Sequence, residues 1–360
     1  MLFPRSRRPT ASHQRGAALV VALLVFALCT ALIVAMKREF TLFYQRGSNV
    51  FVAEQAYSYL LGAEELASLA LQIDFDQDKT RERPRDDLTE FWSADAIPYP
   101  IDRYSSVAGE LEDLQGRFNL NWLGVVGGSA NPANPGVLQY TVAQQRFIRL
   151  LQALPSVEVG EVEAKAITDA IRDWIDADSV SLGNGAEDDF YFSQTPPYRA
   201  ANRLMVSVSE LRAVANITPE IYTALAPWVS ALPDNVSLNI HTAPPILLRT
   251  INEDGNYQPL SEADGQNLFE YRCETEFEDV ANFLENPVFS GKVPKDMGKD
   301  LGETSSFFLL AAQAEVAERQ VRLYSVLERN DRAIKVVARA SGSLYTQLDR
   351  SEIQKCKIEL

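Results

Sequence analysis

An uncharged apolar run near the amino end, from Ala17 to Met36, constrains this chain more than any other feature. The run is rich in Ala, Val and Leu, and its length matches the roughly 20 residues with which a helix crosses a bilayer core. It is longer than the apolar core of an ordinary secretory signal, and no small-residue cleavage site follows it. The run therefore predicts one membrane-spanning helix that continues into the rest of the chain.

The charges around the run predict its orientation. Arginines precede it at several positions: Arg5, Arg7, Arg8 and Arg15. This bias indicates a cytoplasmic amino end. The body would then lie across the inner membrane, in the periplasm of a Gram-negative bacterium. Lys37 and Arg38 after the run weaken this prediction slightly.

The chain as a whole is acidic. Its 360 residues include 49 Asp and Glu against 34 Lys and Arg, a net charge of −15. Such a surface repels phosphates, so the composition argues against nucleic acid as a main partner. It suits an extracytoplasmic body or one that binds divalent cations. The length allows two domains with ordinary cores.

Residues typical of catalytic sites are sparse. Beyond the first sixteen residues, His241 is the single histidine, and its apolar, proline-rich surroundings favour a packed or surface residue over a general base. The sequence has no His/Cys cluster for zinc, no phosphate-binding G-x-x-x-x-G-K-[ST] loop, no G-x-S-x-G elbow and no G-x-G-x-x-G turn. We therefore predict that the protein is not an enzyme.

The cysteines allow one disulfide. Cys29 lies in the apolar run, where it is expected to pack as a small hydrophobe. Cys273 and Cys356 would meet an oxidising compartment, so a Cys273–Cys356 disulfide is predicted. Two free thiols are the alternative.

The acidic stretch DADSVSLGNGAEDDF, residues 176–190, has the carboxylate spacing of a calcium loop. Asp176, Asp178 and Glu187 occupy its first, third and twelfth places, directly after a predicted helix. Val180 and Ser181 stand where an EF-hand needs a ligand and a glycine, which argues against a true EF-hand. Oxygen ligands from this loop, completed by Asp188 and backbone carbonyls, still predict calcium binding, because a hard cation would offset the carboxylate repulsion. A solvated acidic loop is the alternative.

The two ends of the chain predict a long helix and an antiparallel sheet. The apolar run is expected to continue as helix to about Gln72, because one face stays apolar: Phe40, Phe43, Val50, Phe51, Tyr57, Leu60 and Leu61. The charged residues 74–87, with Pro84, predict an exposed loop. Short apolar segments at 307–316, 321–330 and 333–342 predict adjacent antiparallel strands. The second half of the helix would pack on this sheet, an α+β fold.

Between these parts the pattern is mainly helical. One expected helix buries a single face: Val162, Ala166, Ile167, Ala170, Ile171 and Trp174. Thr218 with Pro219, and Ser261 with Asp264, have the spacing of helix starts. We interpret this part as a helical domain inserted into the α+β fold.

The amino end resembles type IV pilins and pseudopilins, which have a basic leader, a glycine and then a long apolar helix. The leader, residues 1–16, resembles a prepilin-peptidase substrate, with cleavage between Gly16 and Ala17 and methylation implied. The family normally carries a glutamate at the fifth mature position, where this chain has Val21. That glutamate pairs with the free amino terminus of the subunit already assembled, and an unpaired carboxylate in a bilayer is costly. Val21 therefore predicts the first subunit, at the fibre tip. A plain single-pass anchor is the alternative.

Further segments extend the resemblance over most of the chain: ELEDLQGRFNLNWL, DWIDAD, GAEDDFY, PPYRAANRLMVSVSELR and LNIHTAPP. In this order they are similar to the K-type minor pseudopilins of the type II secretion system (general secretion pathway protein K). The resemblance implies a pilin-like domain, residues 17–121 and 295–360, interrupted by a helical domain at 122–294 that is SAM-like or helix-hairpin-helix-like. It also implies calcium in the helical domain.

The same resemblance implies a role and partners. The role is to initiate or cap the pseudopilus during protein export across the outer membrane. The implied partners are the I-, J- and H-type minor pseudopilins, the major pseudopilin, the prepilin peptidase, the inner-membrane assembly platform and the exported proteins. The alternative is a tip subunit of a DNA-uptake or type IV pilus-like fibre with a DNA-binding head. Against it, the hairpin ANITPE, residues 215–220, lacks glycine and local positive charge.

Overall fold

The computed structural model describes residues 14–124, 140–181, 183–233, 235–292, 297–343 and 345. Its contacts divide the chain into two compact units, Met1–Ala56 and Tyr57–Leu360. The long helix α1, Gln14–Asp78, runs through both. It therefore continues beyond the predicted end at Gln72.

In the first unit, α1 exposes large apolar side chains over its whole membrane-length segment, from Leu19 to Met36. Among the described residues, α1 is the one helix long and apolar enough to cross a membrane. Water would solvate this surface poorly, whereas lipid tails match it. The observation agrees with the membrane span predicted from the sequence.

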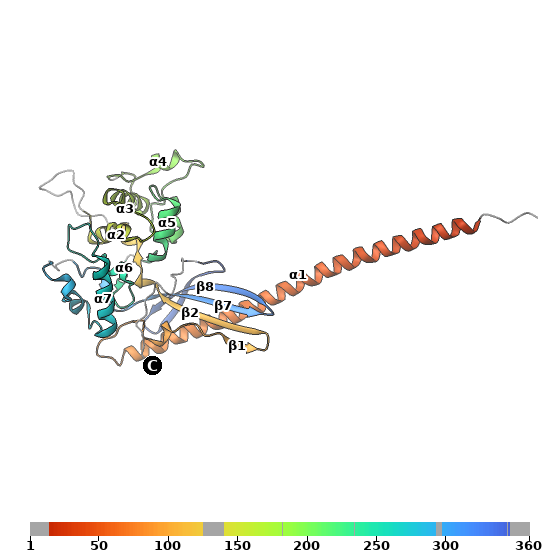
Figure 1. Cartoon of the computed structure of the whole chain (residues 1–360), viewed down its shortest axis with the longest axis horizontal. Coiled ribbons are helices and arrows are strands. Elements are labelled where there is room, and N and C mark those ends of the chain that lie inside the picture. Colours follow the sequence, from red (N-terminus) through yellow and green to blue (C-terminus); the bar gives the residue numbers. More distant parts are fainter. Residues whose placement is uncertain are drawn as a thin grey trace, which may run out of the picture. The chain divides into compact units, whose positions relative to one another are not determined.

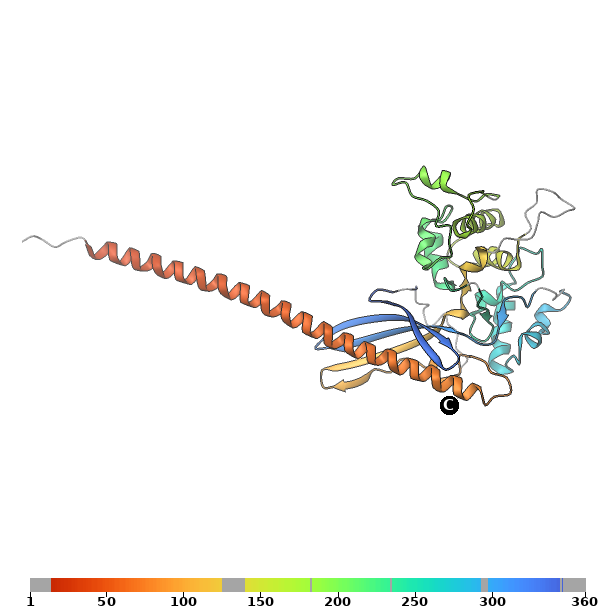
Figure 2. The same cartoon turned by 180° about the vertical axis from the view of Figure 1, so that it is seen from behind.

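In the second unit, α1 packs on an antiparallel sheet (Figure 2). Within the described residues this sheet has five strands in the order β1-β2-β7-β8-β9. The strands are β1 Tyr99–Asp102, β2 Ser105–Asp113, β7 Phe307–Val316, β8 Arg319–Asn330 and β9 Ala333–Ala340. Buried small and apolar side chains give this part of α1 its sheet-facing side: Leu60, Ala63, Ala67 and Leu71. The helix on an antiparallel sheet, and the three C-terminal strands, confirm the prediction.

A mainly helical part lies between β2 and β7, beyond the end of the sheet where β2 stops (Figure 1). Asp113 at the end of β2 pairs with Phe308 in β7, so this part leaves and re-enters the sheet at neighbouring strands. Its helices are α2 Val142–Ala153, α3 Glu161–Ile175, α4 Asp188–Phe192, α5 Pro219–Leu225, α6 Pro245–Leu248, α7 Glu262–Glu274 and α8 Val280–Leu284. The domain limits at 122 and 294 and the SAM-like assignment stay predictions.

Two short parallel pairs complete this part. They are β3 Phe118–Asn119 with β4 Val229–Ser230, and β5 Leu238–Asn239 with β6 Leu301–Gly302. Sheet residues such as Phe307 and Val326 belong to the same apolar core as Phe118 and Phe147 of the helical part. The sheet and the helical part therefore share a core rather than folding around two separate ones.

The prediction of an exposed loop over residues 74–87 is wrong at both ends of this stretch. Asp74 and Asp78 belong to α1 and are buried, and Asp86 and Asp87 are buried as well. Residues 76, 77 and 79–84 are exposed, as predicted. Charged groups can be buried when other groups supply hydrogen bonds and counter-charge. Here Arg329 of β8 does so for Asp74 and Asp86.

The predicted cap at Ser261 is present. The Ser261 hydroxyl accepts a hydrogen bond from the Asp264 backbone N–H, and the Asp264 carboxylate accepts one from the Ser261 N–H. We expect Ser261→Ala to lower the free energy of unfolding by about 1 kcal/mol, measured by urea unfolding of the full chain in detergent. Ser156, an exposed serine between α2 and α3, is the matched control, with Ser156→Ala expected to change it by less than about 0.5 kcal/mol. Equal effects of the two changes would contradict the capping role.

Candidate metal centre

The predicted calcium loop lies between α3 and α4 in the helical part. Helix α3 is amphipathic, and its buried face is Ala164, Ile167, Ala170, Ile171 and Trp174. This face matches the predicted one except at its start, where Ala166 is half-buried and Val162 is exposed. The first turn points away from the core, so Val162 was wrongly assigned.

Aromatic contacts fix the two ends of the loop. The ring of Trp174, at the end of α3, lies 5.2 Å from that of Tyr191 in α4 in an edge-to-face arrangement. Tyr191 in turn stacks obliquely on Tyr198, with ring centroids 5.2 Å apart. Such pairs stabilise more than their buried area alone. They bring the start and the end of the acidic loop together.

The loop gathers three of the predicted carboxylates. Asp176, Asp178 and Glu187 each offer an oxygen, and these oxygens lie within 4.8 Å of one another. Asp176 and Glu187 are buried, and Asp178 is exposed. Calcium binds oxygens at 2.3–2.6 Å, so ligands on opposite sides of one ion are roughly 5 Å apart. The spacing of the three oxygens therefore fits a single calcium ion.

Several buried oxygens here have no hydrogen-bond partner among the described residues. They are Asp176 Oδ1 and both carboxylate oxygens of Glu187. Asn202, whose side-chain amide donates to the Asp178 carbonyl, also has a buried Oδ1 without such a partner. Unsatisfied buried oxygens are costly, and a cation would satisfy them. The oxygen-only donor set suits a hard ion such as Ca²⁺.

Electrostatics at the loop favour a positive charge. Burial raises the pKa of Glu187 to about 7, and the charges of four neighbouring carboxylates add to this effect. They belong to Asp173, Asp176, Asp178 and Asp188. Burial and then the charge of Asp178 also raise the pKa of Asp176, while Arg172 opposes this. Without a cation, carboxylates this close together disfavour their own ionised forms.

Asp188 lies outside the three-carboxylate group. Its Oδ1 accepts a hydrogen bond from the Ala200 N–H at 3.2 Å, and its Oδ2 lies 4.0 Å from Arg199 Nε. Asp173 was not predicted as a site residue, although it is buried and its charge acts on Glu187. It lies in the last turn of α3, three residues before Asp176, which caps that helix, and this spacing could have revealed it. Asn202 comes from a separate loop, and nothing in the sequence pointed to it.

The remaining predicted site residues lie elsewhere. Gly16, Ala17 and Val21 are in α1 within the first unit. Cys273 lies in α7, but Cys356 lies outside the described residues, so their pairing stays a prediction. Burial and then the charge of Arg85 lower the pKa of His241 to about 4. A neutral, buried imidazole agrees with the packed role expected of this residue.

Comparisons with known proteins point to one family. A family model described as "Type II secretion system (T2SS), protein K" matches residues 116–234. The chain is 31% identical over 347 residues to a type II secretion system protein K of Aeromonas hydrophila, covering 93% of this chain and 99% of that protein. It is 30% identical over 333 residues to one from Pseudomonas aeruginosa, covering 91% and 93%.

A solved structure is also similar. It is the crystal structure of the GspK-GspI-GspJ complex from the enterotoxigenic Escherichia coli type 2 secretion system. The matching chain is 26% identical, with a TM-score of 0.68, and the match covers 83% of this chain and 99% of that one. The similarity extends through the sheet and the helical part, since it takes in most of both chains.

Proposed function

Because the chain belongs to the type II secretion system protein K family, we propose that it is the minor pseudopilin at the tip of the secretion pseudopilus. There it would initiate or cap the fibre that exports proteins across the outer membrane. The observation that carries this proposal is the 31% identity to a protein K over nearly the full length of both chains. The relatives named above are secretion proteins, so they lend no support to the DNA-binding alternative.

Val21 supports the tip position. A shaft subunit needs a carboxylate at this place to pair with the amino terminus of its predecessor, and a first subunit has no predecessor. An apolar side chain is then the cheaper choice in the bilayer. The large part inserted between β2 and β7 also supports the tip, because it adds bulk that stacked shaft subunits would have to accommodate.

The proposed location is the inner membrane, with the amino end in the cytoplasm and the body in the periplasm. The arginines before the apolar run and the exposed apolar surface of α1 support it. Prepilin peptidase would cut after Gly16, followed by methylation.

The proposed partners begin with the I- and J-type minor pseudopilins, because the similar solved structure is a complex with GspI and GspJ. An H-type subunit, the major pseudopilin and the assembly platform follow from the same role. Contact with exported proteins is part of the proposal as well. The exposed stripe of α1 in the second unit, which includes Leu66, Leu69 and Ile73, offers one surface for such helix packing.

We also propose that Asp176, Asp178 and Glu187 hold a calcium ion. The support is the set of buried, unpartnered oxygens and the cluster of like charges described above. The ion would neutralise these carboxylates and join the end of α3 to the start of α4. Its role would be structural.

The function is tested by co-expressing the full chain with prepilin peptidase and with I- and J-type pseudopilins. We expect a mature chain that begins at Ala17 and that co-purifies with both partners from detergent-solubilised membranes. The measurements are intact mass, N-terminal sequencing and size-exclusion chromatography. Gly16→Leu is the matched control and should remain uncut. A chain that begins at Met1 in the presence of the peptidase, or that elutes without partners, would refute the proposal.

A further inference from the structure

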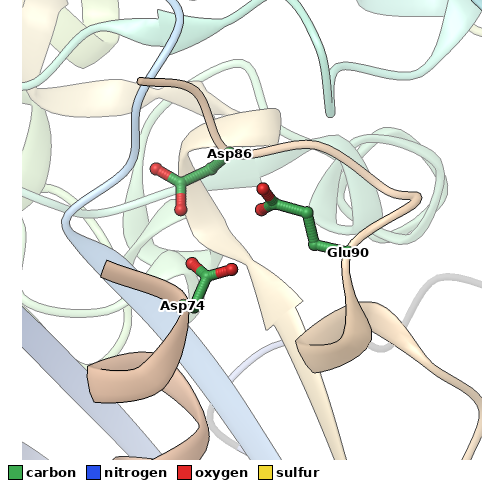
Figure 3. Close-up of side chains that lie close together, drawn as sticks. All are labelled: Asp74, Asp86 and Glu90. Atoms are coloured by element: carbon green, nitrogen blue, oxygen red, sulfur yellow. The ribbon is translucent and has the colours of Figure 1, made fainter. Parts of the chain in front are cut away.

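A second group of carboxylates is buried in the second unit, at the end of α1 (Figure 3). Asp74 comes from the last turns of α1, and Asp86 and Glu90 come from the segment between α1 and β1. Their side chains turn toward a common space, with oxygens within 4.8 Å of one another. Asp74 is 2% exposed and Asp86 is fully buried, so water does little to screen them.

Two arginines supply the positive charge. Arg329 of β8 contacts Asp74 Oδ2 at 3.0 Å and also binds Asp86. Arg81 contacts Glu90 Oε1 at 2.6 Å and Asp78 Oδ1 at 3.0 Å. Together these residues form what we call the carboxylate clasp: Asp74, Asp78, Arg81, Asp86, Glu90 and Arg329. Within it, acids outnumber arginines, so full ionisation would leave a buried negative charge.

The hydrogen bonds indicate which acids are ionised. Asp86 accepts bonds from Arg329 and from the Ser305 N–H, and Glu90 accepts them from Arg81 and the Trp92 indole. Donors of this kind favour the charged carboxylate. Among the described residues, the donor to Asp74 is Arg329, whose guanidinium also donates to Asp86 through its other terminal nitrogen. Among the three clustered acids Asp74, Asp86 and Glu90, Asp74 is therefore the one that a proton neutralises at least cost.

The pKa shifts of Asp74 and Asp78 agree with a protonated acid in this cluster. Burial, then the charges of Glu90 and Asp86, raise the pKa of Asp74 to about 8, against the opposing charge of Arg329. Burial and the same two neighbours raise the pKa of Asp78 to about 7. Both groups lie beyond the membrane-length segment of α1, against the sheet.

A metal ion suits this cluster less well than a proton. Guanidinium groups already contact Asp74, Asp86 and Glu90, so a divalent ion would sit beside two positive charges. The loop with Asp176 and Glu187 differs, because Asp176 Oδ1 and both carboxylate oxygens of Glu187 have no donor among the described residues.

We propose that the carboxylate clasp is a pH-sensitive device, in which a proton shared at Asp74 fastens the end of α1 to the sheet and its loss at alkaline pH loosens this attachment. Loosening would reach the helical part, since the Asp86 carbonyl accepts a hydrogen bond from Asn239 and the Asp86 N–H donates to the Glu303 carbonyl. Other charged and titratable groups around the clasp come from α1, the following segment, β2 and the segment after β5: Asp76, Arg85, Asp87, Asp113 and His241.

The direction of the pH effect follows from proton counting. An aspartate in the unfolded or opened segment titrates near its ordinary value, about 4. In the closed state, in which the end of α1 is attached to the sheet, Asp74 keeps its proton until about pH 8. The closed state thus binds more protons between about pH 4 and pH 8, and its stability falls as the pH rises through this range.

The test is hydrogen–deuterium exchange of the full chain in detergent at pH 6, 7 and 8, corrected for intrinsic exchange rates. In peptides covering residues 74–90 we expect the opening equilibrium to rise by at least about tenfold from pH 6 to pH 7, and by less from pH 7 to pH 8, where Asp74 begins to lose its proton in the closed state too. Asp74→Asn should lose the share of this rise that Asp74 contributes and keep the smaller share expected from Asp78, whose pKa is about 7. Asp76→Asn is the matched control, because Asp76 lies two residues further along α1 in an exposed pair with Arg332, and it should keep the wild-type rise.

A second variant keeps the proposal testable if Asp74→Asn does not fold. Glu90→Gln removes a charge that raises the pKa of Asp74, so the pH at which opening levels off should shift downward. A wild-type segment whose opening is independent of pH, or an Asp74→Asn variant with the full wild-type rise, would overturn the proposal. So would protection restored at pH 8 by magnesium or calcium in the wild type but not in Asp74→Asn, since the cluster would then be a metal site.

Discussion

Chelation of calcium is expected to lower the thermal unfolding midpoint of the full chain, because apo protein would leave the Asp176–Glu187 carboxylates uncompensated. With calcium at 100 to 1,000 times its dissociation constant, binding stabilises a folded protein by about 3–4 kcal/mol. We expect a loss of this size when EDTA is added, measured by scanning calorimetry in detergent and reversed by excess calcium but not by magnesium at equal concentration. The preference follows from the larger, more flexible oxygen shell of calcium.

Variants of the loop make this prediction specific. The double variant Asp176→Asn, Glu187→Gln should melt at the same temperature with and without calcium. Asp189, an exposed acid beside the loop, lies outside the three-carboxylate group. Asp189→Asn should therefore keep the full calcium response. Equal melting of the wild type with EDTA and with calcium would rule out the metal proposal.

Arg329→Met is expected to lower the free energy of unfolding by about 3–5 kcal/mol, because it removes one partner of a buried ion-pair network. Arg329 contacts Asp74 and Asp86, donates to the Ser305 carbonyl and lies over the ring of Phe308, 4.9 Å from its centroid. Methionine fills much of the space but supplies no donor. The measurement is urea unfolding of the full chain at pH 7.

Arg332→Met is the control for this change. Arg332 forms an ion pair with Asp76 on the surface, 3.0 Å apart, with both side chains substantially exposed. Exposed pairs contribute about 0–1 kcal/mol. A similar loss in the two variants would mean that Arg329 does not stabilise the fold through its buried acids.

The parts of the fold that were predictable are those with a strong local pattern. The strands β7, β8 and β9 are short apolar segments separated by polar turns, and the apolar surface of α1 is continuous along the sequence.

The hairpin of β1 and β2 was missed for a physical reason. All residues of β1, Tyr99–Asp102, are exposed, so it has no buried face to produce alternation. Its strand conformation depends on pairing with β2.

The candidate metal centre was predictable to the extent that its ligands are local. Asp176, Asp178 and Glu187 come from one loop, and their spacing allowed a shared ion beside the alternative of a solvated loop, with the family resemblance favouring the ion. Asn202 belongs to a separate segment, and it reaches the loop only through tertiary contacts. The carboxylate clasp shows the same limit more strongly. Residues 74–87 have the composition of a solvated loop, and the burial of Asp74 and Asp86 depends on Arg329, more than 200 positions later in the chain.

The pairing of β2 with β7 has a consequence for the order of folding. Asp113 and Phe308 are neighbours in the sheet, yet the whole helical part lies between them in the chain. Closing so long a loop costs entropy, whereas β7, β8 and β9 follow one another through short turns and can pair early. During synthesis, α1, β1 and β2 leave the ribosome before β7 exists. The buried face of α1, which includes Leu60 and Leu71, therefore stays without a complete sheet to pack on until β7, β8 and β9 have been synthesised.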